Sequence, residues 1–298
     1  MITSKYVYKM TTQGAATPPV LKQGRLRVLL FLIPWVTTIY IFDLVSNWII
    51  KQLLGDVKFS IGGNIPSLIK FAVGGVGATL VVWIYRVGID KQSFKSLGFA
   101  LRPFTSDAGI GFFAAPAILG IGSLLLVLSG YIQFTSLNTD IADLLLEAVL
   151  MMIISFSEEV VIRGYMLHNL MESLNRWVAL TITAVFFAAM HLANPDVSFL
   201  SFINILAAGF LLGINYIYTK NLWFGLCFHF TWNFFQGPVY GYKVSGIPFS
   251  GFFQQFSTGP ALWTGGQFGF EGSLLCLILA NIAVLLLARF FSKKYATG

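Results

Sequence analysis

The sequence predicts an all-α, polytopic membrane protein with about eight transmembrane helices. Apolar residues make up 56% of the 298-residue chain and charged residues only 10%, which is too little charge to cover a soluble domain of this length. The charged residues also gather at the ends of long apolar runs, as a bilayer requires. Because open strands cannot satisfy their backbone groups in lipid, we expect the spans to be helices.

Eight segments come close to the roughly 20 apolar residues that are needed to cross about 30 Å of hydrocarbon. They are residues 28–50, 66–86, 108–132, 143–169, 177–194, 197–219, 222–236 and 273–291. The first is too long, and lacks a small-residue cleavage site, to be a removed signal peptide, so we expect it to be retained. The fifth and seventh are short enough to be tilted or partly submerged.

The distribution of Lys and Arg predicts that both termini face the cytoplasm. With this orientation, four of the 19 Lys and Arg residues lie on the outer side, namely Lys51, Lys58, Lys70 and Lys243. The inner side carries the other fifteen, which is the bias expected for cytoplasmic segments. We therefore expect a cytoplasmic segment over 1–27, a single transmembrane domain over 28–291 with a catalytic core at about 140–236, and a cytoplasmic tail over 292–298.

The composition excludes several classes of protein. The net charge of +7 follows from the positive-inside bias, and the chain has no basic stripe with interleaved aromatic residues, so we expect no nucleic-acid partner. Cys227 and Cys276 lie in apolar runs without a C-x-x-C pattern, which predicts small buried side chains rather than a redox or metal motif. The partner that the composition itself implies is membrane lipid.

The fourth segment carries two adjacent carboxylates and an Arg in an otherwise apolar helix. Glu159 and Arg163 are four residues apart, so they share a face and can pair. Glu158 points about 100° away and is left free for proton transfer. The alternative is that both acids are solvated at a helix end, but Glu158 lies about 16 Å inward from Asn169. Ionisable residues at such depth predict a functional site.

Two further segments place polar groups at a similar depth. His191 follows Phe187 by one turn, and His229 and Asn233 share a face in the same way. Each pattern alone is common, because a single His or Asn in a span also serves as interhelical glue. Counted from the inner ends of their helices, however, these three side chains and Glu158 fall within about 11 Å of depth. We therefore expect them to meet in one water-accessible pocket. We expect His168, nearer the inner end, to be interfacial.

The motifs E-E-x-x-x-R (Glu158, Glu159, Arg163), F-x-x-x-H (Phe187, His191) and H-x-x-x-N (His229, Asn233) occur in this order. This ordered set resembles the CPBP family of CAAX proteases and bacteriocin-processing enzymes, also known as the Abi family. The resemblance implies an eight-helix enzyme similar to the Ras-converting CAAX prenyl endopeptidase. It also implies that Glu158 and His191 activate water, that His229 and Asn233 stabilise the oxyanion, and that Arg163 fixes Glu159.

The sequence leaves two chemistries open. Glu158, His191 and His229 are the residue types of a zinc site with two His and one Glu, which keeps a position open for water. The H-E-x-x-H pattern of many zinc proteases is absent, so we favour hydrolysis without a cofactor and keep zinc as the alternative.

The leading hypothesis is an intramembrane endopeptidase that cleaves a peptide presented at or within the cytoplasmic half of the bilayer. Its substrate is a peptide or protein, with lipid-modified and membrane-anchored chains as the natural candidates. We expect it in the bacterial plasma membrane, or in the endoplasmic reticulum if the chain is eukaryotic. One alternative is a non-catalytic scaffold or bacteriocin-immunity-type regulator. Another is a proton-coupled transporter, against which the absence of inverted repeats argues.

Overall fold

The computed structural model describes residues 18–57, 62 and 64–295. Residues 1–17 of the predicted N-terminal segment, Lys58 of the predicted outer side and residues 296–298 of the predicted tail therefore lie outside the described part of the chain.

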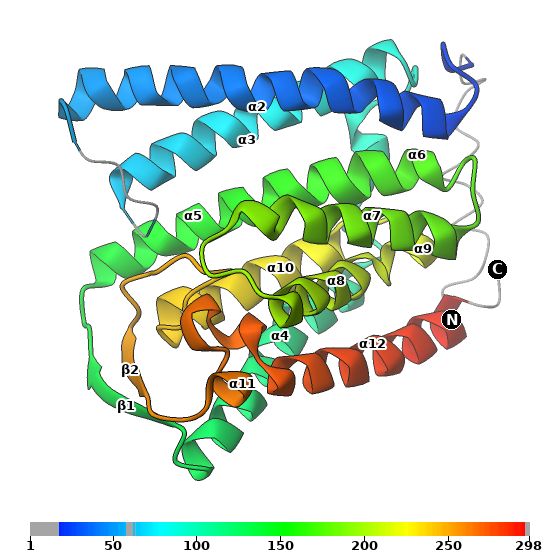
Figure 1. Cartoon of the computed structure of the whole chain (residues 1–298). Helices are drawn as coiled ribbons and strands as arrows, with labels where there is room; N and C mark the ends of the chain where they lie inside the picture. Colours follow the sequence, from blue (N-terminus) through cyan, green and yellow to red (C-terminus); the bar gives the residue numbers. More distant parts are fainter. Residues whose placement is uncertain (1–17, 58–61, 63, 296–298) are drawn as a thin grey trace.

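The described residues form an antiparallel helical bundle with one main helix in each predicted segment (Figure 1). These helices are α2 (Gly24–Leu54), α3 (Ile65–Gly88), α4 (Thr105–Leu128), α5 (Ile141–Glu159), α7 (Arg176–Met190), α8 (Phe199–Gly213), α10 (Trp223–Phe234) and α12 (Leu274–Tyr295). The helices alternate in direction, so the described ends of the chain lie at the same end of the bundle. The prediction of an all-α membrane protein is confirmed.

Six of the helical segments are long and apolar enough to cross a membrane by length and composition. The remaining two are α5 and α10. Helix α5 holds Asp143, Glu147, Glu158 and Glu159 within 19 residues, and α10 is only 12 residues long. The two helices that depart from the composition of an ordinary span thus carry most of the polar side chains singled out above.

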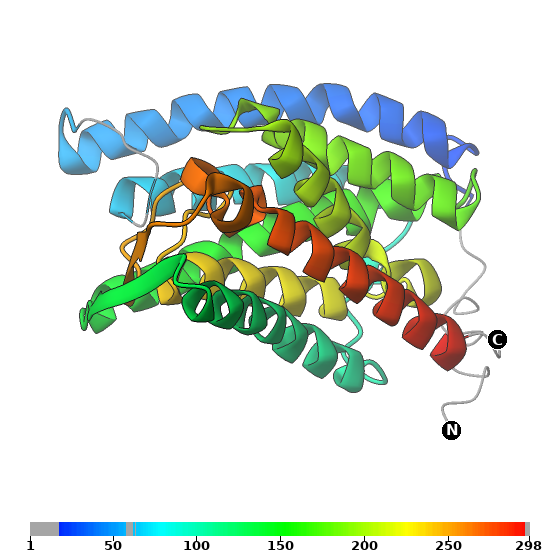
Figure 2. The ribbon, with the colours of Figure 1, turned by 60° about the horizontal axis from the view of Figure 1, so that its bottom comes forward.

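The helices pack in a defined order around α5 and α10. Helix α3 packs between α2 and α5, α10 packs between α5 and α4, and α8 packs between α7 and α12. The view in Figure 2 shows the same arrangement, with α2 on the opposite side of the bundle from α4. Gly209 and Gly213 allow α8 to approach α7 closely, since a Cβ at Gly209 would lie 2.8 Å from Ala184 Cα. This is the close packing that small residues allow in membranes.

The helical segment that begins with α5 continues beyond Glu159 without a break. A π-helix over Val160–Leu167 and the short α6 (His168–Leu170) follow directly on Glu159. π-Helical turns inside α-helices are frequent at functional sites, because the extra residue per turn redirects side chains. Here the wider turns carry Arg163, which lies directly behind the two glutamates.

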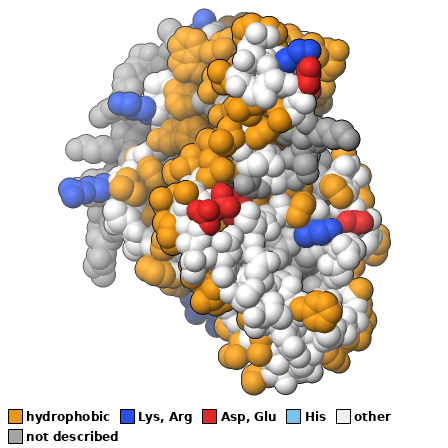
Figure 3. Space-filling view, turned by 90° about the vertical axis from the view of Figure 1, so that its left-hand side faces the viewer, with side chains coloured by type: hydrophobic (Ala, Val, Ile, Leu, Met, Phe, Trp, Pro, Cys, Tyr) orange, Lys and Arg blue, Asp and Glu red, His pale blue; other side chains and the backbone are white. Residues whose placement is uncertain are grey.

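The end of the bundle opposite the termini carries a small sheet that the sequence analysis did not predict. Strand β1 (Ile132–Leu137) pairs antiparallel with β2 (Phe253–Ser257). The third span ends at Leu128 instead of residue 132, because Ile132 already belongs to β1. Pairing between strands about 120 residues apart leaves no trace in local hydropathy. Figure 3 looks onto this end, where charged side chains are few and scattered.

The long connection over 237–272 folds back into the bundle. Tyr242, Val244, Phe268 and Phe270 are buried, as the Gly- and Phe-rich composition of this loop suggests. It contains the end of a π-helix (Phe235–Val239), β2, α11 (Ala261–Thr264) and the 3₁₀ turns Gly266–Phe268 and Phe270–Gly272. The loop therefore forms part of the helical core at this end.

The opposite end is closed by the stretch that follows α3. A 3₁₀ turn over Phe94–Leu97 buries Leu97 completely. Gly98 follows with φ +118°, and its carbonyl accepts a hydrogen bond from Leu222 N at 3.0 Å. A Cβ on Gly98 would lie 2.5 Å from Lys220 O, so only glycine permits this contact.

Candidate active site

The bundle encloses a cavity of about 240 Å³ that is bordered by α5, α7, α8 and α10. Four of the six predicted site residues line it, namely Glu158, His191, His229 and Asn233. Most of the remaining lining side chains are apolar. The structure therefore brings together groups from three helices that are separated by up to 75 residues along the chain.

Glu159 and Arg163 form a buried ion pair behind this cavity. Nη1 of Arg163 donates to Oε1 of Glu159 at 2.7 Å, and Nη2 donates to the carbonyl of Gly209 at 3.1 Å. The guanidinium also lies over the ring of Phe187, 4.6 Å from its centroid. Arg163 thus contacts its own helix, α7 and α8, which fixes the position of Glu159 on α5.

Glu159 also contacts His229, which lies on α10. Nδ1 of His229 lies 3.0 Å from Oε1 of Glu159. The two helices meet closely because Gly225 precedes His229 by one turn, and a Cβ at that position would lie 2.8 Å from Oε2 of Glu159. A carboxylate only accepts hydrogen bonds, so Nδ1 of His229 carries the proton of this contact.

Glu158 is the carboxylate that faces the cavity. Its Oε2 lies 3.8 Å from Nε2 of His229, and about a quarter of the side chain is exposed (24%). This oxygen is buried and makes no hydrogen bond among the described residues. Oε2 of Glu159 is also without a hydrogen bond among the described residues. The two glutamates differ in that Glu159 is held in the ion pair with Arg163, whereas Glu158 lines the cavity.

His191 lies at the end of α7 and presents one ring nitrogen to the cavity. Its Nδ1 lies 2.7 Å from the carbonyl of Phe187. Because a carbonyl can only accept, Nδ1 bears the hydrogen in the neutral ring and Nε2 keeps a lone pair. The ring of Phe187 packs against both histidines, with centroid distances of 4.7 Å to His191 and 6.0 Å to His229.

Asn233 lines the cavity one turn beyond His229, on the same face of α10. Its side chain is buried, and its amide offers two hydrogens. The cavity thus combines a free carboxylate oxygen, a ring nitrogen with a lone pair, and donors on α10. This set can take a proton from water and stabilise a negative oxygen.

Comparison with known families agrees with this arrangement. Residues 140–235 match the family described as Type II CAAX prenyl endopeptidase Rce1-like. The match covers about a third of the chain. It supports a CAAX-type intramembrane protease, and together with the apolar helices it supports an integral membrane protein. No curated protein and no solved structure matches the chain.

The cavity also has polar lining residues that the sequence analysis did not single out. They are Asn194 and Asn204 within the matched residues 140–235, and Ser245 and Glu271 beyond them. Glu271 accepts hydrogen bonds from Trp232 Nε1 at 2.9 Å and from the backbone and hydroxyl of Ser245, both at 2.8 Å. It therefore ties the loop to α10. The only signal in the sequence was a polar residue in, or next to, an apolar segment.

The lining residues also show where the cavity leads. It reaches the connections at the end opposite the termini through Asn194, Val244, Ser245, Ile247 and Phe249. Among the described residues, none of the connections at the other end contributes to the lining. The peptide was expected at the cytoplasmic half, whereas the cavity extends toward the end that the charge bias assigns to the outside. Depth counted along single helices does not show how loops fold between them.

The alternative zinc site was tested against the same geometry. Within the described residues, no group of three or more His, Cys, Asp or Glu side chains is placed to hold a metal ion. Nδ1 of His229 contacts Glu159 and Nδ1 of His191 contacts a backbone carbonyl, so Nε2 is the nitrogen that each ring keeps for other contacts. Because the described residues are not gathered into a metal-binding group, the hydrolysis proposed below runs through no metal.

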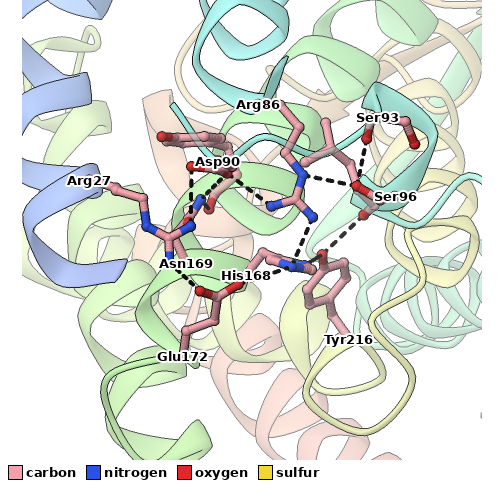
Figure 4. Close-up of polar contacts among 11 residues, drawn as sticks. Arg27, Arg86, Asp90, Ser93, Ser96, His168, Asn169, Glu172 and Tyr216 are labelled. Atoms are coloured by element: carbon pink, nitrogen blue, oxygen red, sulfur yellow. Dashed lines mark hydrogen bonds and ion pairs between the residues drawn. The ribbon is translucent and has the colours of Figure 1, made fainter. Parts of the chain in front are cut away.

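A second polar cluster lies at the end of the bundle near the termini (Figure 4). Asp90, just after α3, lies between two arginines, 3.2 Å from Nη1 of Arg27 and 2.9 Å from Nη1 of Arg86. All three side chains are buried. Arg27 also pairs with Glu172, so the two cations face two anions.

His168 belongs to this cluster and is buried, so the expectation that it is interfacial is wrong. Its Nε2 lies 3.1 Å from Nη2 of Arg86, and its Nδ1 lies 3.0 Å from the hydroxyl of Tyr216. A guanidinium only donates, so Nε2 must accept and Nδ1 carries the proton. Tyr216 in turn donates to the carbonyl of Leu97. The cluster connects α2, α3, α6 and α9 (Tyr216–Thr219), and it is separate from the cavity.

Proposed function

We propose that the chain is an endopeptidase that hydrolyses a peptide bond near the membrane with water activated by Glu158 and His191. His229 and Asn233 stabilise the oxyanion. The observation that carries this proposal is that all four side chains line a single cavity. Hydrolysis of an amide requires a base for water and donors for the negative charge that develops on the carbonyl oxygen.

Glu158 and His191 supply the base. Glu158 has a buried oxygen without a hydrogen bond among the described residues, and His191 has a lone pair on Nε2 because its Nδ1 contacts the carbonyl of Phe187. One of the two accepts the proton of the attacking water, and the other orients the water molecule. The water oxygen then bonds to the carbonyl carbon, whose oxygen becomes negative.

His229 and Asn233 face this oxygen as donors. Because Nδ1 of His229 already donates to Glu159, donation from Nε2 requires that the ring carries both protons. The two glutamates on α5 compensate for that charge, with Glu159 at 3.0 Å and Glu158 at 3.8 Å from the ring nitrogens. The amide of Asn233 adds a neutral donor. Fixed donors in a site that excludes water lower the barrier most.

The reaction ends with cleavage of the C–N bond. The proton taken from water passes to the leaving nitrogen, which departs as an amine. The carbonyl carbon keeps the water oxygen, with its second proton, as the hydroxyl of a carboxylic acid. Glu159 and Arg163 do not touch the reacting atoms in this scheme. They hold His229 in its orientation, which is a positioning role.

The lining favours a substrate with apolar side chains next to the scissile bond. Met151, Ile154, Leu211, Phe228 and Trp232 surround the polar groups, and these side chains suit a membrane-anchored or lipid-modified peptide. Such a substrate reaches the cavity from within the bilayer plane or from the loops at the end opposite the termini.

The proposal is tested by Glu158→Gln in purified membranes or nanodiscs, with a prenylated fluorogenic CAAX peptide as substrate. We expect turnover to fall at least about 10³-fold, because the base for water is lost. The matched control is Glu147→Gln. Glu147 is a buried glutamate on the same helix that lies outside the cavity and accepts a hydrogen bond from Ser250 N, a bond that a Gln oxygen can also accept.

Peptide-terminus mass spectrometry on cells with and without active Glu158 identifies natural substrates. If Glu158→Gln retains turnover, the proposed chemistry is wrong. If the cells carry a phenotype that Glu158→Gln leaves intact, the chain acts as a scaffold or regulator.

A further inference from the structure

Asn204 is a buried polar residue in the wall of the cavity. It lies on α8, and the side chains that share its face, Ala208, Leu211 and Leu212, also line the cavity and are apolar. Asn204 therefore interrupts an otherwise apolar wall. Its side chain is almost fully buried, with 2% exposed.

The orientation of the Asn204 amide is fixed by one contact. Nδ2 donates to the carbonyl of Ser273 at 2.9 Å, at the start of α12. A carbonyl can only accept, so the nitrogen and not the oxygen faces Ser273. Oδ1 consequently points to the other side of the amide, and this oxygen is buried without a hydrogen bond among the described residues.

Two buried oxygen atoms in the described lining of the cavity share this condition, Oε2 of Glu158 and Oδ1 of Asn204. Native proteins rarely leave buried acceptors unpaired, and the exceptions call for an explanation such as a ligand. The proposed mechanism accounts for Glu158 through the attacking water. It does not account for Asn204.

A structural contact between helices explains only the Nδ2 atom of this side chain. The bond from Nδ2 to Ser273 joins α8 to α12, as polar residues in spans often do. Oδ1 takes no part in that contact and carries the desolvation penalty of an unpaired acceptor.

We propose that Asn204 is a substrate-binding residue whose Oδ1 accepts a backbone N–H of the bound peptide. The inference rests on the proposed function. A peptide in this largely apolar cavity loses the water bound to its backbone, and every buried N–H then requires an acceptor. His229 and Asn233 provide donors for a carbonyl, while Asn204 provides the acceptor for an N–H.

The recognition of a backbone N–H predicts which substrates are preferred. Oδ1 contacts a backbone N–H of the substrate and not a side chain. The enzyme therefore tolerates different apolar side chains at the substrate position that Asn204 contacts. It selects against an N-substituted residue there, such as proline or an N-methyl amino acid, because neither offers a hydrogen.

The test combines Asn204→Ala with a series of substrates that carry one N-methyl group each. The parent is the prenylated fluorogenic CAAX peptide, methylated in turn at each residue except the scissile bond. We expect Asn204→Ala to lower kcat/KM for the parent about tenfold, mainly through KM. At one position, methylation costs the wild type a similar factor but costs the variant nothing more, because both changes remove the same hydrogen bond.

The matched control is Asn281→Ala. Asn281 is an exposed Asn on α12 whose Nδ2 also donates to a carbonyl, that of Leu277. We expect this variant to behave as the wild type on every substrate. If Asn204→Ala does not fold, Asn204→Leu removes the same oxygen, keeps about the volume of the side chain and is read in the same way.

Binding measurements separate this inference from the proposed function. The Kd values of parent and methylated peptides are measured in the Glu158→Gln background, with and without Asn204→Ala. One outcome is that the wild type cleaves none of the peptides while the Kd values show that methylation and Asn204→Ala remove the same hydrogen bond. In that case the proposed function fails and the role of Asn204 stands. If methylation and Asn204→Ala are additive at every position, or the variant binds as the parent protein does, the inference is overturned.

Discussion

Nδ1 of His229 lies 3.0 Å from Oε1 of Glu159, and this contact joins α10 to α5 where the cavity begins. Glu159 in turn accepts from Arg163 at 2.7 Å. The three side chains are buried, so their charges interact without much screening. The contact determines which nitrogen of His229 is left to face the cavity.

Glu159→Gln is expected to destabilise the fold by about 3–5 kcal/mol, because it leaves the charge of Arg163 buried without its partner. Denaturant unfolding in detergent measures this effect. Replacing both residues in Glu159→Leu/Arg163→Met should restore most of the stability but not the activity, since His229 has still lost its carboxylate. A double variant with wild-type turnover would contradict the positioning role.

Asn233→Ala is expected to lower kcat about 10²-fold or more, because it removes one donor to the oxyanion. KM should change little, because the lost hydrogen bond forms only as the negative charge develops on the carbonyl oxygen. Steady-state kinetics with the prenylated fluorogenic peptide measure both constants. Wild-type kcat in Asn233→Ala would remove Asn233 from the oxyanion role.

Asp90→Asn is expected to destabilise the protein by about 3–5 kcal/mol, because Arg27 and Arg86 then face each other without the carboxylate between them. The control is Asp56→Asn, which breaks an exposed ion pair with Lys51 and should cost at most about 1 kcal/mol. Thermal unfolding of both variants checks this difference. Equal losses of stability in the two variants would show that the second polar cluster, around Asp90, does not stabilise the bundle.

Removal of divalent metal is expected to leave turnover unchanged, because the proposed mechanism activates water with Glu158 and His191 and runs no step through a metal. The measurement is metal analysis of the purified protein together with activity after dialysis against a chelator. Inhibition that is reversed by stoichiometric zinc would show that these side chains rearrange around a metal.

The side of the membrane on which the cavity opens decides which substrates reach it. The charge bias predicts that Gln267, which is exposed at the end opposite the termini, faces the outside. Gln267→Cys should therefore react with an impermeant maleimide in intact cells, whereas Lys95→Cys should react only after lysis. The background carries Cys227→Ser and Cys276→Ser. The reverse pattern would place the opening in the cytoplasm, within reach of cytoplasmic prenylated tails.

Local properties of the sequence predict the class of fold and the residues of the candidate site. Long apolar runs and the spacing of polar residues along one helix are local properties, so they gave the spans, the pair of Glu159 with Arg163, and the free position of Glu158. Matching depths predicted that His191, His229 and Asn233 lie near it, and the structure places them in one cavity.

How those groups are oriented, and what surrounds them, depends on contacts between segments that are far apart in the sequence. Which nitrogen of His229 faces the cavity depends on Glu159, a residue 70 positions away. The burial of His168, the pairing of β1 with β2 and the unpaired oxygen of Asn204 likewise depend on contacts between distant segments. Hydropathy and periodicity record which side of a helix is apolar. They do not record which other helix or loop packs against it.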